Sequence, residues 1–187
     1  MNYTKLTDQE LILLIQSDPQ AHFEALLYRY ENQVFVYACR LLNYNQENAE
    51  DVCSEVWYKC YKSILAFNTK KKFISWVYQI THNQAIDYIR KHHKIQIQSI
   101  DKSSEAFFIE SKSYSSEDKL IYIQHILQLL NPQDRSLLTL HYLEEKTVPE
   151  IAEIFSLLPK LISLKLFRAK RRAQKIAKLH YPTLIFD

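Results

Sequence analysis

Residues 47–94 read ENAEDVCSEVWYKCYKSILAFNTKKKFISWVYQITHNQAIDYIRKHHK, and apolar side chains recur through them every three or four positions. This is the spacing of one face of an α-helix. The polar break Asn68-Thr69-Lys70 interrupts the pattern. The stretch therefore predicts two consecutive helices, one from about Glu47 to Ala66 and one from about Phe73 to His92.

The same helical spacing continues on both sides of this stretch, without convincing alternating strands, and predicts an all-α fold. Four local signals mark expected helix starts. Thr7-x-x-Glu10 and Thr147-x-x-Glu150 are capping boxes, in which a hydroxyl and a carboxylate each satisfy an end amide. Asp18-Pro19 and Asn131-Pro132 each place an N-cap residue before a first-turn proline.

Between Lys94 and Asp118 the sequence becomes Ser-rich and acidic, with DKSSE and SKSYSSED on either side of an apolar AFFI. This composition predicts a linker over 95–118, between a domain at 1–94 and a second at 119–187. In the second domain, helices at about 147–155 and 159–175 are joined by a short turn, which is the spacing of a helix-turn-helix motif.

The 187 residues include no glycine. Glycine-rich phosphate loops, dinucleotide-binding turns and nucleophile elbows are therefore excluded in their usual form. No nucleophile and base stand together in the sequence, so we expect no enzyme and no cofactor, with a small helical hydrolase as the remote alternative. His82, His92 and His93 lack a cysteine or carboxylate at ligand spacing, so we expect no metal site.

No apolar run reaches the roughly 18 residues of a membrane-spanning helix, and the first ten residues lack the pattern of a signal peptide. We therefore expect a cytoplasmic protein without membrane insertion. Cys39, Cys53 and Cys60 are odd in number and lack CxxC spacing, which favours buried thiols.

Charge is strongly segregated along the chain. The net charge is −4 over 1–69, +5 over 70–94, −3 over 95–118 and +5 over 119–187. Two basic segments separated by acidic ones are typical of two contacts with a polyanion such as nucleic acid. Solvated helix faces would produce the same pattern, so charge alone leaves both interpretations open.

The helix expected at 73–92 carries a narrow polar stripe. Trp76, Asn83, Asp87 and Arg90 are separated by 7, 4 and 3 positions, so they share one face at about 100° per residue. An indole can stack on an unpaired base, an amide can bond a base edge, and the lysines and arginines can neutralise phosphates. Alternatively Trp76 belongs to the core, which we favour, and Asp87 and Arg90 form an ordinary surface pair.

Residues 47–94 and two segments of the second domain resemble a known protein family. The landmarks of residues 47–94, in order, are Ala49-Glu50-Asp51, Glu55-Val56-Trp57, Phe67, Phe73, Trp76, Ile80, Asn83, Asp87 and Arg90. They resemble conserved region 2 of bacterial sigma-70 family factors of the extracytoplasmic function (ECF) type. The segments LNPQDRSLLTLHYLEEKTVPEIAEIF (130–155) and LFRAKRR (166–172) look like region 4 of the same family.

The resemblance implies that the helix from Phe73, with the loop before it, recognises and melts a −10 promoter element. Trapping unstacked bases and contacting phosphates would drive the opening, which requires no catalytic group. The implied −10 contacts are Lys70, Lys71, Lys72, Trp76, Asn83, Asp87, Arg90 and Lys91.

The preceding helix is implied to dock on the clamp helices of the RNA polymerase β′ subunit through Asp51, Ser54 and Glu55. Acidic groups suit basic partners and contribute specificity and association rate more than affinity. The alternative role of these acids is helix solubility. Ser54 departs from the family, which commonly has Gln at this position.

The last helix is implied to read a −35 element, because the second helix of such a motif enters the major groove. The candidates are Lys160, Ser163, Lys165, Arg168, Lys170, Arg171 and Arg172. Alternatively these cations complement the dipole at the C-terminal half of the helix.

Departures from the family gather at this motif. Ser156 stands where Gly is usual, Leu158 replaces the usual Ser or Thr cap, and Lys160-Leu161 replaces a Gly-Thr pair. Leu157, Leu158 and Leu161 have three alternative roles: packing against the polymerase β flap, touching thymine methyls, or closing a tighter core.

The resemblance thus implies a transcription-initiation subunit that binds core RNA polymerase, through the β′ clamp helices and the β flap, and promoter DNA. We expect a monomer when free, and an anti-sigma factor is a further partner common in the family. Two alternatives remain: a helix-turn-helix regulator that acts without polymerase, and a degenerate sigma-like protein that no longer reads the −35 element.

Overall fold

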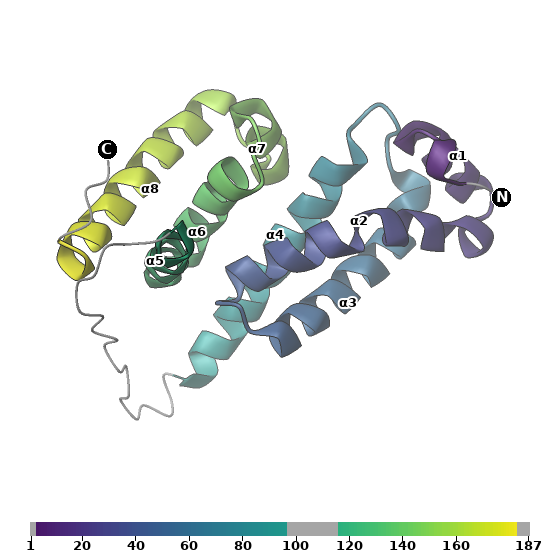
Figure 1. The fold of residues 1–187 in the computed structure, drawn as a ribbon. Helices are drawn as coiled ribbons and strands as arrows, with labels where there is room; N and C mark the ends of the chain where they lie inside the picture. The colour runs from purple at the N-terminus through teal and green to yellow at the C-terminus, as the bar shows by residue number, and fades with distance from the viewer. Residues whose placement is uncertain (1–2, 97–115, 183–187) are drawn as a thin grey trace.

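The computed structural model describes residues 3–96 and 116–182, and these form helices and turns without a strand (Figure 1). The predicted all-α class is therefore confirmed. The helices form two groups, which Figure 1 shows side by side. The first group holds η1 (Tyr3–Lys5), α1 (Asp8–Ser17), α2 (Pro19–Leu41), α3 (Gln46–Ser63), η2 (Ile64–Ala66) and α4 (Phe73–Gln96). The second holds α5 (Ser116–Leu129), α6 (Pro132–Leu138), a π-helical turn η3 (Thr139–Leu143), α7 (Val148–Phe155) and α8 (Pro159–His180).

Local capping explains where most of these helices begin. Both predicted capping boxes form. The backbone N–H groups of Thr7 and Thr147 each donate to the carboxylate of the glutamate three positions later, at 2.8 and 3.0 Å. The Asp18 carboxylate accepts from the Ala21 amide at 3.2 Å, and Asn131 caps α6 at 3.0 Å. The four helix starts predicted from these signals are confirmed.

Some helices run further than predicted. Helix α4 continues to Gln96 and α5 begins at Ser116, so both ends of the stretch expected as a linker are helical. Residues 97–115 of that stretch, with the AFFI segment, lie outside the described residues. Helix α8 extends past the expected end at Lys175, as far as His180.

One continuous apolar core joins the two helical groups. Leu26 and Val56 from the first group and Leu140 and Ile151 from the second are fully buried in the same cluster. Cys39, Cys53 and Cys60 are buried and unpaired, which confirms the prediction of buried thiols. Burial raises the pKa of Cys53 and Cys60 to about 12. Within the described ranges, no helix combines the length and the apolar character needed to cross a membrane.

Candidate nucleic-acid and polymerase interfaces

The outer face of α4 presents Asn83, Asp87 and Arg90, whose side chains are all exposed. Arg90 donates to the Asp87 carboxylate at 3.2 Å, which is the surface pair that the sequence also allowed. Trp76 is half-buried, with its ring centroid 4.8 Å from that of Phe67. Trp76 therefore packs on the core while part of its surface stays open beside the stripe.

The loop before α4 carries three consecutive exposed lysines, Lys70, Lys71 and Lys72. Asn68 shapes this loop, because its side chain accepts from the Lys70 amide at 3.0 Å and its carbonyl accepts from the Lys71 amide at 2.9 Å. Lys72 donates to the Glu150 carboxylate of α7 at 2.8 Å. That bond, with those from Thr147, lowers the pKa of Glu150 to about 2, and it raises the pKa of Lys72.

The predicted polymerase-binding residues Asp51, Ser54 and Glu55 are exposed on α3. They line a groove of about 620 Å³ together with Asp87 and Lys91 of α4. Packing of α3 against α4 therefore brings the expected polymerase contacts and two of the expected −10 contacts to one surface. Sequence spacing alone did not indicate this meeting, because it depends on how the two helices pack.

The turn before α8 has the departures expected from the sequence. Ser156 adopts the left-handed conformation, with φ 51° and ψ 44°, which is unfavourable for a residue with a Cβ. Leu158 occupies the N-cap position of α8 and makes no side-chain cap bond. Packing instead holds the helix, through the buried side chains of Ile162, Leu166 and Ala169.

The residues expected to read the −35 element are divided between sides of α8. Lys165, Arg168 and Arg172 line a polar cavity of about 610 Å³ that also includes His82 of α4 and Asp134 of α6. The remaining members are exposed on α8: Lys160, Ser163, Lys170 and Arg171. The Ser163 hydroxyl donates to the Pro159 carbonyl at 3.2 Å, and the Arg171 guanidinium lies 5.9 Å from the Phe167 ring centroid. Lys170 also borders an apolar groove of about 450 Å³ between α5, η3 and α8.

Arg172 forms an ion pair within the second helical group. Its Nη2 donates to Asp134 Oδ1 at 2.7 Å, and its Nε donates to the other carboxylate oxygen. The Asp134 residue is only 5% exposed, and its hydrogen bond to Arg172 raises the pKa of the guanidinium. Asp134 lies in the first turn of α6, and its position in the sequence gave no indication of this pairing. A contact of Arg172 with DNA stays a prediction.

The exposed fractions of the leucines before and in α8 test one of the three roles considered for them, which is closing the core. Leu158 is 69% exposed and Leu161 is 44% exposed, so neither closes the core. Leu157 is half-buried and packs against the core. Leu164 and Phe167, which the sequence reading did not single out, add exposed apolar area on α8. Their positions three and six residues after Leu161 were the available signal.

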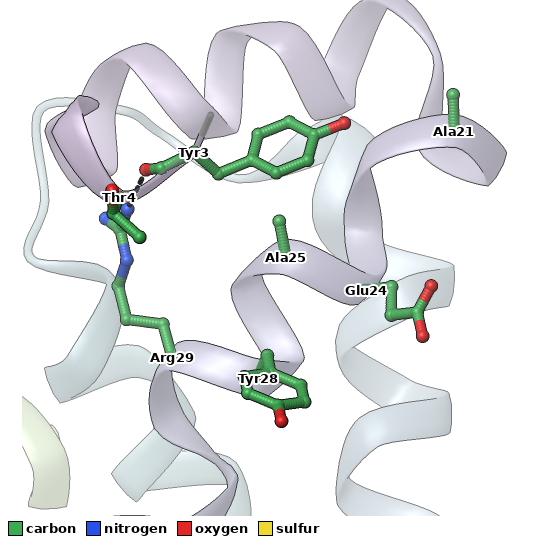
Figure 2. Close-up of a pocket in the computed structure, with 7 residues that line it drawn as sticks. All are labelled: Tyr3, Thr4, Ala21, Glu24, Ala25, Tyr28 and Arg29. Carbon is green, nitrogen blue, oxygen red and sulfur yellow. Dashed lines mark hydrogen bonds between the residues drawn. The ribbon is translucent and has the colours of Figure 1, made fainter. Parts of the chain in front are cut away.

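A hollow of about 820 Å³ lies at the N-terminal end of the molecule, away from the predicted site residues. Figure 2 shows it between Tyr3 and Thr4 on one side and the α2 residues Ala25 and Tyr28 on the other. The Arg29 guanidinium donates to the Tyr3 carbonyl at 2.8 Å and to Asp8 at 2.6 Å, so this cation serves the packing of the N-terminus onto α2.

The described part of the chain holds no group of three or more His, Cys, Asp or Glu side chains that could bind a metal ion. His92 stacks on Tyr88, with ring centroids 4.1 Å apart, and His82 contacts Ser136 and Phe155.

Two family models match the chain: sigma-70 region 2 over residues 26–95 and sigma-70 region 4 over residues 120–172. The ECF RNA polymerase sigma-E factor of Haemophilus influenzae is 29% identical over 179 residues, which cover 89% of this chain and 93% of that protein. The first match contains α3, the lysine loop and all of α4 except its last residue, and the second contains α7 and the N-terminal part of α8.

Two solved structures share the fold. CnrH in complex with the cytosolic domain of CnrY has a TM-score of 0.67 at 17% identity, covering 92% of this chain and 97% of that one. The sigma factor RpoE in complex with the anti-sigma factor NepR from Bartonella quintana has a TM-score of 0.65 at 20% identity, covering 84% and 97%.

Proposed function

The chain belongs to the sigma-70 family as a sigma factor of the ECF type that binds RNA polymerase, and we propose that it directs the polymerase to two-part promoters and helps to open them. The observation that carries the proposal is the outer surface of α4, where exposed Asn83, Asp87 and Arg90 stand beside a half-buried tryptophan and a loop of three lysines. Sigma factors are regulatory subunits, so the proposed role needs no catalytic group.

In this proposal the α4 surface binds the −10 element in its single-stranded form. The open part of Trp76 offers a face for a base to stack on, which is worth about 1–3 kcal/mol per base. The Asn83 amide bonds a base edge, while Lys70, Lys71, Arg90 and Lys91 contact phosphates. Opening follows because each trapped base offsets the few kcal/mol that unstacking costs.

The exposed acids of α3 serve polymerase in this proposal. Asp51 and Glu55 meet basic side chains of the β′ clamp helices, and Ser54 lies between them on the same exposed surface. The groove that they share with Asp87 and Lys91 supports a coupling of the two contacts, because polymerase bound at α3 would stand next to DNA bound at α4. The proposal also places the chain in the cytoplasm, where bacterial transcription takes place.

The second helical group reads the −35 element in this proposal, with α8 in the major groove and the β flap as its polymerase contact. The candidate base and phosphate contacts are Lys160, Ser163, Lys165, Arg168, Lys170, Arg171 and Arg172. Exposed Leu158 and Leu161 would lie at the groove end of α8, where apolar side chains can contact thymine methyl groups.

The absence of a side-chain cap on α8 also favours the second candidate, a sigma-like factor that has lost −35 reading. The two candidates differ in one result. Substituting −35 bases lowers transcription if α8 reads them, and leaves transcription unchanged, with −10 dependence kept, if it does not.

An anti-sigma partner is part of the proposal as well. It is supported by the two solved structures of similar fold, one of which contains an anti-sigma factor. We propose that the chain is a monomer when no partner is bound.

The test is transcription in vitro from a promoter library with bacterial core polymerase, with and without the purified protein. We expect protein-dependent transcripts that share upstream motifs. Asn83→Ala should lower them roughly tenfold, since one lost base contact is worth about 1–3 kcal/mol. Asn32→Ala, at an exposed amide of α2, is the matched control and should leave them unchanged.

The polymerase contact is tested by direct binding to core polymerase. Asp51→Ala with Glu55→Ala should slow association roughly tenfold, because charged rims act mainly on association rate. Glu24→Ala with Glu31→Ala removes two exposed acids from α2 and is the control. Equal association rates for the two double variants would show that Asp51 and Glu55 do not make the polymerase contact.

A further inference from the structure

The last turn of α1 carries a glutamine whose side chain bonds the backbone at the end of α3. The Gln16 Nε2 atom lies 2.9 Å from the Ile64 carbonyl oxygen and 2.9 Å from the Phe67 carbonyl oxygen. The Leu65 carbonyl oxygen is further away, at 3.5 Å. A side-chain amide has two N–H groups, and these match the two closer carbonyls. One side chain therefore holds the backbone both before and after η2.

The Phe67 carbonyl stands where the chain leaves the helix. Carbonyls at a helix end have no partner inside the helix and must find one elsewhere. The Phe67 amide donates to the Ile64 carbonyl at 3.1 Å, and the backbone then becomes extended, with φ −68° and ψ 130° at Phe67. The bond from Gln16 therefore fixes the backbone at the entrance to the loop before α4.

Helix α1 is itself well anchored. Leu11 and Ile15 are fully buried in the core, and the capping box of Thr7 fixes the first turn. Figure 1 shows α1 at the same end of the first helical group as the loop between α3 and α4. Helix α1 precedes residues 26–95, the part of the chain that matches sigma-70 region 2, so that match assigns no role to Gln16.

Phe67 connects the Gln16 contact to both parts of the proposed −10 surface. Its ring centroid lies 4.8 Å from that of Trp76, the proposed stacking face. The next residue, Asn68, accepts from the amides of the first two lysines of the loop, at 3.0 and 2.9 Å. A shift of the backbone at Phe67 would therefore move the neighbour of the tryptophan and the base of the lysine loop together.

We infer that Gln16 is a positioning residue for promoter opening. Its amide holds the Phe67 carbonyl and thereby keeps the loop before α4 in the shape that receives unstacked bases and phosphates. The role in opening rests on the proposed function. Groups that are already in place lose less conformational freedom when they bind, so the contact lowers the cost of trapping the opened strand. The polymerase contact of α3 does not depend on it.

Hydrogen exchange of the free, full chain tests the effect on the loop. Gln16→Ala should speed exchange of the Lys71 amide roughly fivefold, as the loss of one hydrogen bond of ordinary strength allows. Gln9→Ala, at an exposed amide of the same helix, is the matched control and should leave exchange unchanged. The amide of the buried Val56 in α3 is the internal reference. Equally faster exchange at Val56 would mean general destabilisation and would overturn a positioning role.

Promoter opening is measured with saturating holoenzyme rebuilt from core polymerase and each variant. On duplex promoter, Gln16→Ala should slow opening roughly fivefold relative to wild type and to Gln9→Ala. On a template mismatched over the −10 element the bases are already unpaired, so the same variant should differ from wild type by less than about twofold. Equal slowing on both templates would indicate a structural defect and would overturn the inference.

Two further substitutions test the donated hydrogen bonds. Gln16→Glu keeps the shape of the side chain but offers no N–H, so it should slow opening at least as much as Gln16→Ala. Gln16→Lys restores N–H donors and should recover most of the wild-type rate. Circular dichroism checks that each variant retains its helical content. Equal opening rates for the glutamate and lysine variants would overturn the assignment to these bonds.

Failure of this inference is distinct from failure of the proposed function. Wild-type protein that opens promoters, with Gln16→Ala equal to it in opening and in loop exchange, contradicts the inference alone. Wild-type protein that never opens a promoter contradicts the proposed function and with it the role of Gln16 in opening. Faster exchange of the loop in Gln16→Ala would in that case still support the contact of Gln16 with the loop.

Discussion

Helix α8, the last of the molecule, begins in a different way from the first three α-helices. Helices α1, α2 and α3 each follow a residue, Thr7, Asp18 or Asn45, whose side chain accepts a bond from the first turn. Helix α8 follows Leu158, which offers no such bond, and a left-handed serine. The comparison teaches that local sequence specifies where α1, α2 and α3 begin, whereas packing and long-range polar contacts hold α8.

The largest effect should come from Arg135, whose buried guanidinium donates to four carbonyls, including those of Leu127 and Leu41. Arg135→Met leaves these buried acceptors unpaired and should lower the free energy of unfolding by about 4 kcal/mol. Urea unfolding followed by circular dichroism measures the change. Arg168→Met, at an exposed position of α8, should stay within about 0.5 kcal/mol. Similar losses of free energy of unfolding in the two variants would contradict the importance given to the buried contacts of Arg135.

The next effect is pH dependence at the buried contact between the halves. Burial lowers the pKa of His82 from its ordinary 6.5 to about 4. Between pH 6.5 and pH 4 the His82 imidazole is protonated in the unfolded chain but neutral in the folded chain. The contribution of His82 to the free energy of unfolding is therefore fully present above pH 6.5 and is lost as the pH drops toward 4. The shift corresponds to at most about 3 kcal/mol.

The surroundings of His82 agree with this sign. Ser136 and Phe155 contact the ring, and the same cavity includes the cations Lys165, Arg168 and Arg172, with Asp134 as the acid. Unfolding measured at several pH values should show a slope over this window that His82→Gln removes. An unchanged slope in that variant would contradict the assignment.

Most helix starts could be predicted because the signals are local. Thr7, Asn131 and Thr147 cap helices within three residues of themselves. Asn83, Asp87 and Arg90 share one exposed face because they lie on a single helix, which fixes their spacing.

The contacts of Arg172, Glu144 and His82 could not be predicted, since each pairs with a residue at least 38 positions away. For His82 a signal existed. It stands four residues after the buried Tyr78 and three before the buried Ala85, on the inner face of α4.

Substitutions at the N-caps of α7 and α8 test the comparison of helix starts, with smaller expected changes in the free energy of unfolding. Leu158→Ser supplies the missing N-cap oxygen of α8 and should raise the free energy of unfolding by about 1 kcal/mol. Thr147→Ala removes the cap of α7 and should lower it by about 1 kcal/mol. Urea unfolding of the two variants and the wild type gives both values. A destabilised Leu158→Ser would mean that the leucine side chain matters more than the cap.

The smallest effect is expected at Ser156. Ser156→Gly relieves the left-handed conformation but loses the bond from Gln79, so the net gain should be only about 0.5 kcal/mol. In a Gln79→Ala background the bond is already absent, and the same substitution should gain more. Equal effects in the two backgrounds, measured by urea unfolding, would show that the bond between Gln79 and Ser156 adds no stability.

The division of promoter reading between the halves is tested most directly by combining protein variants with promoter substitutions. Transcription by core polymerase is measured for wild type, Asn83→Ala and Lys160→Ala with Arg168→Ala, on templates altered at −10 or at −35. The account predicts that Asn83→Ala loses sensitivity to −10 substitutions only, and that the α8 variant loses sensitivity to −35 substitutions only. Equal sensitivity of all three proteins to both sets of templates would contradict it.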